Sequence, residues 1–384
     1  MNRILVVRYS ALGDVVLATA VLRALRARHA GASIEALTDA PYAAVLAPWC
    51  DAPVWTLDRT APRAKEIARL GGALRARRFD AVLDLQGKLT SRVLARLSGA
   101  RRFGPPARAA TGGDAPPVHA LDRYRAAAAA LVGAAPLPDP AAVTPGGLAA
   151  ARAALARRLP AARGPRVVLL PGARHATKRW GAARFGALAA LLVGTRGAGV
   201  LLAGGPMDAG EIAATHAAAL GALARTGSVA TAGAAATTAH GRISSGPVPV
   251  TAGPGTETPP WAAALLGQAV TGPDVADLLA LVAGADVVVA GDTGALHLAA
   301  AAGVPTLGLF GPTDPRAWAP RGAAILWHHP SCAPCSTHGQ RRCSEPRRHC
   351  LDDLPPAEAL AALDKVDALL GARTGAEGDA RGAP

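Results

Sequence analysis

The sequence predicts an α/β protein with two doubly wound parallel sheets, and three observations support this prediction. Short apolar runs alternate with helical stretches along most of the chain, which is the rhythm of β-α-β units. The rhythm loosens around residues 133–165 and then restarts. The 384 residues also exceed what a single hydrophobic core usually supports. We therefore expect one domain in residues 1–160 and a second in residues 161–353.

In the first half, three apolar runs are typical of strands: RILVVRY at 3–9, SIEALTD at 33–39 and FDAVLDLQ at 79–86. The first leads directly into a predicted helix over 13–29. The turn between that strand and helix lies where open α/β sheets place their ligands. It does not contain the glycine pattern G-x-G-x-x-G of dinucleotide-binding turns.

In the second half, RVVLLPGA at 166–173 and GVLLAGGP at 199–206 predict strands, and residues 274–285 predict a helix that leads into another strand. Residues 224–260 interrupt this pattern with Thr, Gly, Pro and Ala and with few large apolar side chains. Such a segment buries little surface, so we expect a mobile insertion there and a disordered tail over 372–384.

The charge of +14 is concentrated in residues 1–125, which hold twenty Lys and Arg against ten Asp and Glu. A basic face of this kind suits an anionic partner. Aromatic residues make up only 3% of the chain and no nucleic-acid-binding motif is present, so nucleic acid is not the expected partner. Five cysteines without an apolar secretory signal predict a cytoplasmic protein without a disulfide framework.

The first candidate site residue is Asp14, in RYSALGDVV at the turn after the first strand. One interpretation is an acid at a helix N-terminus, where the helix dipole favours it. The other is a carboxylate at the mouth of a cleft that takes a proton from a hydroxyl.

The second candidate is Lys178, in LPGARHATKRW after the first strand of the second sheet. With the neighbouring Arg174 and Arg179 it could meet a diphosphate. The alternative is a solvated basic loop.

The stretch GDTGALHLAA, residues 291–300, places glycines and Thr293 at a helix start, where backbone N–H groups and the dipole favour phosphate. Asp292 could instead cap the helix, and His297 could be a structural histidine. Further on, Cys332, Cys335, Cys343 and Cys350 allow either a zinc site or a cysteine-bearing surface loop. Their spacing matches no common zinc ribbon or finger.

Together these stretches resemble glycosyltransferase family 9, the ADP-heptose:lipopolysaccharide heptosyltransferases. The resemblance rests on RYSALGDVVLATAVLRAL, PGARHATKRW, GDTGALHLAAAAGVPTLGLFGPTDP and the terminal C-x2-C…C…C-L, and it extends from residue 3 to about residue 370. It implies a GT-B architecture, in which the first domain holds the acceptor and the second holds the nucleotide sugar. A helix over 354–371 would cross back to the first domain.

The resemblance also implies an inverting, metal-independent transfer that needs no cofactor. Asp14 would be the general base and Lys178 would neutralise the departing ADP. The implied donor-binding residues are Asp292, Thr293, Gly294 and His297, with Ser10 near the same cleft. The family often carries a glutamate after the GGP turn, and here either Asp208 or Glu211 could take its role.

The implied partners are ADP-heptose and a Kdo or heptose acceptor of the lipopolysaccharide inner core. The enzyme would be a monomer, peripheral on the anionic inner leaflet of the inner membrane. Basic residues of the first half are candidates for holding the acceptor or the lipid surface: Arg59, Arg63, Lys65, Lys88, Arg92, Arg101 and Arg102. Alternatives are a different nucleotide-sugar donor, a sugar-nucleotide epimerase and a nucleotide-sugar-binding protein without activity.

Overall fold

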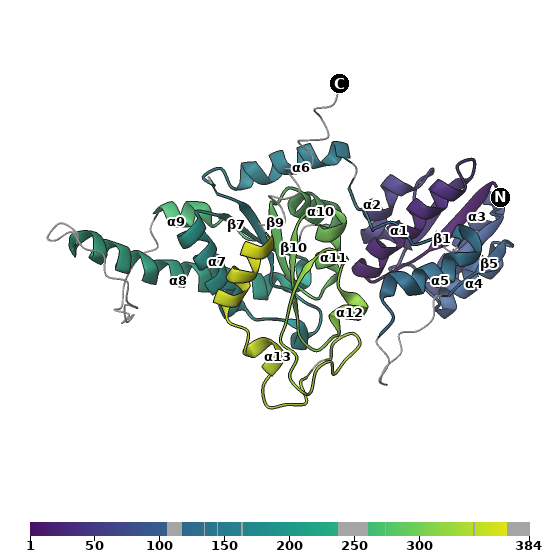
Figure 1. Ribbon diagram of the computed structural model, residues 1–384. Coiled ribbons are helices and arrows are strands. Elements are labelled where there is room, and N and C mark those ends of the chain that lie inside the picture. The colour runs from purple at the N-terminus through teal and green to yellow at the C-terminus, as the bar shows by residue number, and fades with distance from the viewer. Residues whose placement is uncertain are drawn as a thin grey trace, which may run out of the picture.

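The computed structural model describes residues 1–105, 117–133, 135–143, 145–162, 164–236, 260–272, 274–340 and 342–366. Two separate parallel sheets form its framework (Figure 1). The first has five strands in the order β3-β2-β1-β4-β5, and the second has six in the order β11-β10-β9-β6-β7-β8. This confirms the predicted α/β class with two doubly wound sheets.

The strands of the first sheet are β1 (Arg3–Val7), β2 (Ser33–Asp39), β3 (Trp55–Leu57), β4 (Ala81–Asp84) and β5 (Arg101–Phe103). Its helices are α1 (Leu12–Arg28), α2 (Ala43–Leu46), α3 (Arg63–Arg77), α4 (Leu89–Leu97) and α5 (Ala120–Val132). Residues 4–7 of β1 are all buried, as expected of a central parallel strand covered on both faces. Helices α1 and α5 pack on one face of the sheet, and α3 and α4 pack on the other.

The second sheet comprises β6 (Arg166–Leu170), β7 (Gly199–Gly204), β8 (Val270–Thr271), β9 (Val287–Gly291), β10 (Thr306–Phe310) and β11 (Ala324–Trp327). Its longer helices are α6 (Pro145–Arg158), α7 (Ala182–Arg196), α8 (Ala209–Ala236), α10 (Val275–Ala283) and α11 (Gly294–Ala301), besides a helix over 356–366. Shorter turns are η3 (Ala176–Lys178), η4 (Pro206–Asp208), α9 (Pro260–Leu265), α12 (Pro315–Trp318) and α13 (His349–Asp352).

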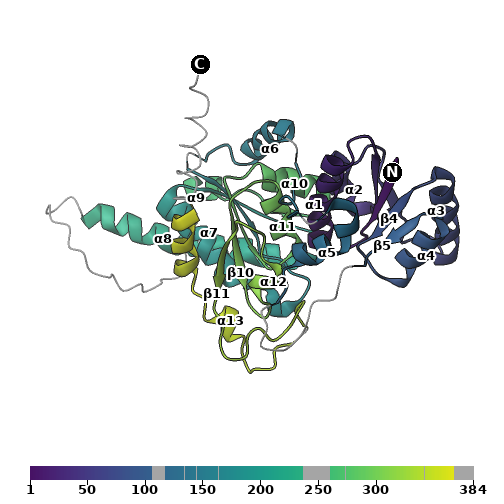
Figure 2. The same ribbon diagram turned by 45° about the vertical axis from the view of Figure 1, so that its right-hand side comes forward.

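The two domains share one hydrophobic core, because helices from both sheets meet between them. Buried residues of α1 and α5 belong to the same cluster as buried residues of α10 and α11. Figure 2 shows α1 and α11 where the two halves of the molecule meet. The carboxyl ends of β1 and β9, which lead into these two helices, therefore lie close together.

Helix α6 lies on the second sheet although it falls inside the expected first domain, 1–160. It packs along α10, and a Cβ atom at Gly284 would lie only 2.4 Å from the carbonyl oxygen of Ala151. The chain therefore passes to the second domain before α6. The loosened sequence pattern marked this region without fixing the point of transfer.

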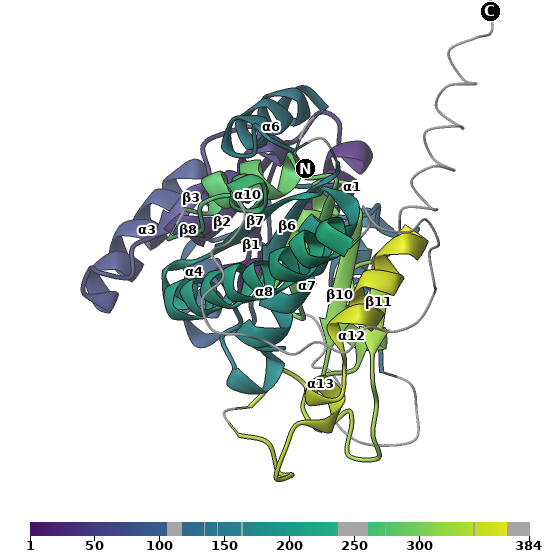
Figure 3. The ribbon, with the colours of Figure 1, turned by 90° about the vertical axis from the view of Figure 1, so that its left-hand side faces the viewer.

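Two further expectations differ from the structure. Residues 224–236, expected as the start of a mobile insertion, continue α8, consistent with the high helix propensity of their alanines. The rest of that insertion up to residue 259, and the tail 372–384, lie outside the described residues. The helix 356–366 was expected to cross back, but it packs beside α7 on the second sheet through Ala359, Leu363 and Val366 (Figure 3).

Candidate active site

The first turns of α1 and α11 touch across the domain boundary, and two glycines permit the contact. A Cβ atom at Gly294 would lie 2.7 Å from the Cβ of Leu12 and 2.8 Å from the backbone nitrogen of Gly13. A Cβ atom at Gly13 would lie 3.0 Å from Cδ2 of His297. The close approach brings Asp14 and the start of α11, predicted independently as site residues, into one location between the sheets.

Asp14 has two polar partners from the first domain. Its Oδ2 lies 2.5 Å from the Nη2 of Arg8, and its Oδ1 accepts a hydrogen bond of 3.0 Å from the hydroxyl of Tyr124. Burial and the Asp14 carboxylate both raise the pKa of Tyr124 well above its ordinary value, so the phenol stays protonated and donates. The Asp14 side chain keeps 27% of its surface exposed, which leaves it accessible from the space between the domains.

Ser10 lies between β1 and α1, where its backbone N–H donates to Oε1 of Gln86 over 3.3 Å. The N–H of Tyr9 donates to the same oxygen over 2.9 Å, so Gln86 fixes the path of the chain into the turn that carries Asp14. Sequence reasoning gave no role to Gln86 or to Tyr124. Neither residue belongs to a motif: Gln86 reaches the site from the end of β4, and Tyr124 reaches it because α5 packs on α1.

Lys178 and Asp292 form an ion pair of 2.6 Å between Nζ and Oδ2. The Thr313 hydroxyl donates to the same oxygen over 2.6 Å. The Asp292 side chain is only 8% exposed. It follows β9 and binds Lys178 after β6 and Thr313 after β10, so it joins the turns that follow three different strands. The interpretation of Asp292 as the helix cap is wrong, because Thr293 occupies the N-cap position of α11.

The N-terminus of α11 has polar groups without partners among the described residues. Thr293 makes no side-chain capping hydrogen bond, and its buried Oγ1 has no hydrogen-bond partner among the described residues. The first N–H groups of any α-helix have no partner within the helix, and the helix dipole adds a partial positive charge there. These features make the start of α11 a suitable diphosphate site.

His297 lies on the first turn of α11 and is 7% exposed. Burial lowers the pKa of His297, whereas the carboxylates of Asp292 and Asp14 act in the opposite direction. With burial as the largest contribution, the imidazole is neutral at pH 7. A cavity of about 390 Å³ borders His297 and continues along α11 to Pro305, away from Lys178.

Asp208 and Glu211 differ in position. Asp208 accepts a hydrogen bond of 3.0 Å from the N–H of Gly205, and burial raises its pKa. A Cβ atom at Gly172 would lie 2.1 Å from Cγ of Asp208, so this carboxyl adjoins the loop that leads to Lys178. Glu211 lies in the first turn of α8, beyond Asp208.

The structure brings together some of the basic candidates of the first domain and separates others. Arg59 forms two hydrogen bonds of 2.9 Å to Asp39, and Arg63 donates to Thr90. Arg59, Arg63 and Thr90 line a cavity of about 140 Å³. Lys88 lies beside this group at the N-cap of α4. The remaining candidates are exposed on α3, α4 and β5: Lys65, Arg92, Arg101 and Arg102.

The cysteines are all free thiols in the structure. Burial, followed by the neighbouring Cys335, Cys343 and Cys332, raises the pKa of Cys350 to about 11. Among the described residues, no group of three or more His, Cys, Asp or Glu side chains is arranged to hold a metal ion. Within the same residues, no helix is both long and apolar enough to cross a membrane.

Two parallel sheets with a polar site between the ends of their central strands define the class of the protein as a GT-B α/β fold. The family model described as glycosyltransferase family 9 (heptosyltransferase) matches residues 67–233 and 262–345. The chain therefore belongs to glycosyltransferase family 9. No curated protein matches the chain by sequence.

Solved structures share this fold along nearly the whole chain. ADP-heptose lipopolysaccharide heptosyltransferase II of E. coli is 20% identical with a TM-score of 0.67, covering 95% of this chain and 98% of its own. A family 9 glycosyl transferase from Veillonella parvula DSM 2008 is 18% identical with a TM-score of 0.67, covering 95% and 97%. E. coli heptosyltransferase WaaC with ADP is 19% identical with a TM-score of 0.60, covering 95% and 99%.

Proposed function

We propose that the protein transfers heptose from ADP-heptose to a Kdo or heptose residue of the lipopolysaccharide inner core, with inversion. Membership of the heptosyltransferase family supports the reaction class. The observation that carries the assignment of the site is the contact of α1 with α11. It supports the proposal because the first turn of α1, which carries Asp14, touches the first turn of α11, where we expect the diphosphate.

In this proposal Asp14 is the general base. The acceptor hydroxyl oxygen attacks the anomeric carbon, the bond from that carbon to the diphosphate oxygen breaks, and the hydroxyl proton passes to the Asp14 carboxylate. Arg8 and Tyr124 orient the carboxylate, since each holds one of its oxygens. The exposed part of the Asp14 side chain supports access for the acceptor.

Lys178 and the N-terminus of α11 stabilise the ADP leaving group. As the bond breaks, negative charge grows on the diphosphate, and cationic groups fixed in a partly dry site stabilise it. Asp292 holds Lys178 in this position, and the Thr313 hydroxyl in turn donates to Asp292. Thr293 and the Gly294 N–H would contact the phosphates, with Ser10 and His297 bordering the donor. Asp208 is our choice over Glu211 for the donor sugar or ribose, because it adjoins the Lys178 loop.

The acceptor side is assigned to the first domain. Arg59 and Arg63 line the 140 Å³ cavity together with Asp58 and Glu66, and Lys88 lies at the N-cap of α4. These three basic side chains are the groups that would meet the carboxylate of Kdo. Exposed Lys65, Arg92, Arg101 and Arg102 would hold the enzyme, as a monomer, peripherally on an anionic inner leaflet.

A donor screen tests the reaction class. The protein is mixed with ADP-heptose and with other nucleotide sugars, and thermal stabilisation is recorded, followed by transfer to Kdo-lipid A in the presence of a metal chelator. We expect stabilisation by ADP-heptose and chelator-resistant transfer, because protein groups carry the charge neutralisation. Product formed without any acceptor would instead indicate an epimerase, and ADP-heptose binding without transfer would indicate a binding protein.

A further inference from the structure

The cysteine-bearing segment after β11, residues 332–354, lies against the turn that carries Lys178; Arg341 alone is outside the described residues. We call residues 332–354 the cysteine segment. Gly339, with φ +88°, is its point of contact with the lysine. A Cβ atom there would lie 2.9 Å from Cε of Lys178 and 3.1 Å from Cβ of His175. The side chain of Lys178 therefore packs directly on the Gly339 backbone.

Two hydrogen bonds join the cysteine segment to the residue before Lys178. The Thr177 hydroxyl donates to the carbonyl oxygen of Gln340 over 2.7 Å and accepts from the Gln340 N–H over 3.1 Å. Thr177 is only 4% exposed, so these bonds are shielded from water. They fix the backbone of η3 at the position next to the lysine.

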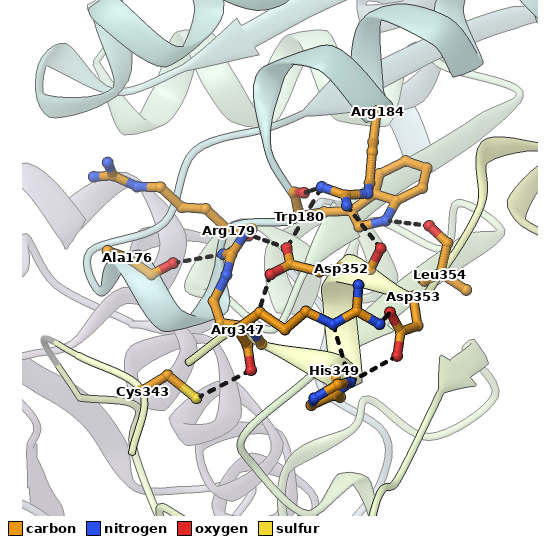
Figure 4. A network of polar contacts seen from close by, with 11 residues as sticks. Ala176, Arg179, Trp180, Arg184, Cys343, Arg347, His349, Asp352, Asp353 and Leu354 are labelled. Carbon is orange, nitrogen blue, oxygen red and sulfur yellow. Dashed lines mark hydrogen bonds and ion pairs between the residues drawn. The ribbon is translucent and has the colours of Figure 1, made fainter. Parts of the chain in front are cut away.

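Arg348 holds the same turn from its other side. Its Nη1 donates to the carbonyl oxygen of Ala176 over 3.0 Å and also to that of Arg179, while its Nη2 pairs with Asp352 over 2.7 Å. Figure 4 shows Ala176 and Asp352 within this one network of polar contacts. Trp180, which follows Arg179 in the chain, is fully buried and donates from its indole nitrogen to the carbonyl oxygen of Leu354 over 3.0 Å.

The cysteine segment also holds the turn after β10. The N–H groups of Cys335 and Ser336 both donate to the carbonyl oxygen of Pro312 over 3.0 Å. The neighbouring Thr313 is the residue whose hydroxyl binds Asp292. The cysteine segment therefore supports Lys178 and also the turn of Thr313, whose hydroxyl binds Asp292, the ion-pair partner of Lys178.

We propose that the cysteine segment positions Lys178 for the diphosphate, with Gly339 and Arg348 as its positioning residues. This inference rests on the role of Lys178 in the proposed function. The ion pair with Asp292 fixes only the ammonium end of a side chain with four rotatable bonds. Gly339 fixes the alkyl stem, and Arg348 fixes the backbone from which the stem projects.

The test compares two variants with two matched controls in the full chain. Gly339→Ala introduces the Cβ atom that meets Lys178, and Arg348→Met removes the donors to the turn. Gly197→Ala is the first control, because φ is also positive there, +57°, and no atom of the described residues lies within 4 Å of its Cβ. Arg347→Met is the second, because Arg347 pairs with Asp353 and His349 instead.

ADP affinity by calorimetry is the measurement, with thermal unfolding recorded for every variant. We expect Gly339→Ala and Arg348→Met to weaken ADP binding about tenfold, the scale of one charged phosphate contact, and both controls to bind as the wild type does. In a Lys178→Ala background, adding Gly339→Ala or Arg348→Met should have no further effect, since both residues act through the lysine.

The outcomes separate the inference from the function on which it rests. If the wild type does not bind ADP, the proposed function fails. If the wild type binds ADP and both variants bind it like their controls, the positioning role is wrong. Equal losses of affinity with and without the lysine would also overturn it, because they would indicate a general structural effect.

Discussion

The hydroxyl of Tyr124 lies 3.0 Å from Oδ1 of Asp14, although 110 positions separate the two residues in the chain. Helix α5 packs on α1 and brings the phenol to the carboxylate. The guanidinium of Arg8 lies 5.7 Å from the centre of the Tyr124 ring and also binds Asp14. The three side chains form one unit that fixes the direction in which the carboxylate faces.

Replacing Tyr124 by Phe should lower kcat about tenfold or more, because a hydrogen bond to a charged group contributes roughly 1.5–3 kcal/mol. The ring that lies beside Arg8 remains. ADP affinity should not change, since the phenol binds Asp14 and its ring lies beside Arg8, and both partners are in the first domain. Steady-state kinetics and ADP titration check this prediction. Tyr42→Phe, on η1 (Ala40–Tyr42), is the matched control, and an equal loss of kcat in both variants would contradict it.

Replacing Gly294 by Ala should separate α1 from α11. The new Cβ would meet the Cβ of Leu12 at 2.7 Å and the Gly13 nitrogen at 2.8 Å, and both residues lie in the first turn of α1 in the other domain. Since a displacement of about 1 Å at a reacting centre can cost ~100-fold in rate, turnover should fall by that order. Small-angle scattering should report a larger radius of gyration. Gly194→Ala, in α7 with open space around its Cβ among the described residues, should change neither quantity.

Replacing Thr313 by Val should destabilise the protein by about 1–3 kcal/mol, because the buried Asp292 carboxylate loses a donor. Valine keeps the branched shape of threonine, so the loss of stability measures the contribution of the hydroxyl. Chemical denaturation measures the free energy of unfolding, and ADP titration shows whether Lys178 has moved. Thr215→Val, which removes a buried hydroxyl bonded to the Glu211 carbonyl in α8, serves as the comparison. Stability equal to the wild type in Thr313→Val would show that the hydroxyl is dispensable.

His297 should make the folded state sensitive to acid. Burial lowers its pKa in the folded protein below the ordinary value of about 6.5 in the unfolded chain. The unfolded state then binds more protons than the folded state once the pH falls below about 6.5, so stability decreases from there toward the lower, folded-state pKa. The wild type should therefore lose more stability between pH 7.5 and pH 5.5 than His297→Gln does. Equal losses, measured by thermal unfolding, would contradict the assignment.

Local pattern in the sequence was sufficient to predict the sheets. The apolar runs at β1, β6 and β9 are continuous because parallel strands are buried on both faces, and the polar residues that follow them lie at one edge. Asp14 and Lys178 could be found in this way. The pairing of Lys178 with Asp292 was not predicted, because it joins turns 114 positions apart.

Contacts between distant segments determine several features of the site and the fold that the local sequence pattern did not predict. Tyr124 stands in no motif, and Arg348 lies between the cysteines without being one of them, so their roles depend on which helix or loop docks beside the site. The helix 356–366 joins the hydrophobic cluster of the second sheet, which includes Trp180 and Phe185, and its apolar positions alone did not identify this partner. Residues 224–236 lack large apolar side chains, yet alanine propensity continues α8 through them.

The central claim, that Asp14 is the general base of a heptosyl transfer, is tested most directly by Asp14→Asn. The amide keeps the shape of the side chain but cannot take the proton of the acceptor hydroxyl. With ADP-heptose and Kdo-lipid A, single-turnover transfer should fall by about 100- to 10,000-fold, while ADP affinity stays within about twofold of the wild type. Transfer at the wild-type rate by the Asp14→Asn variant would contradict the account.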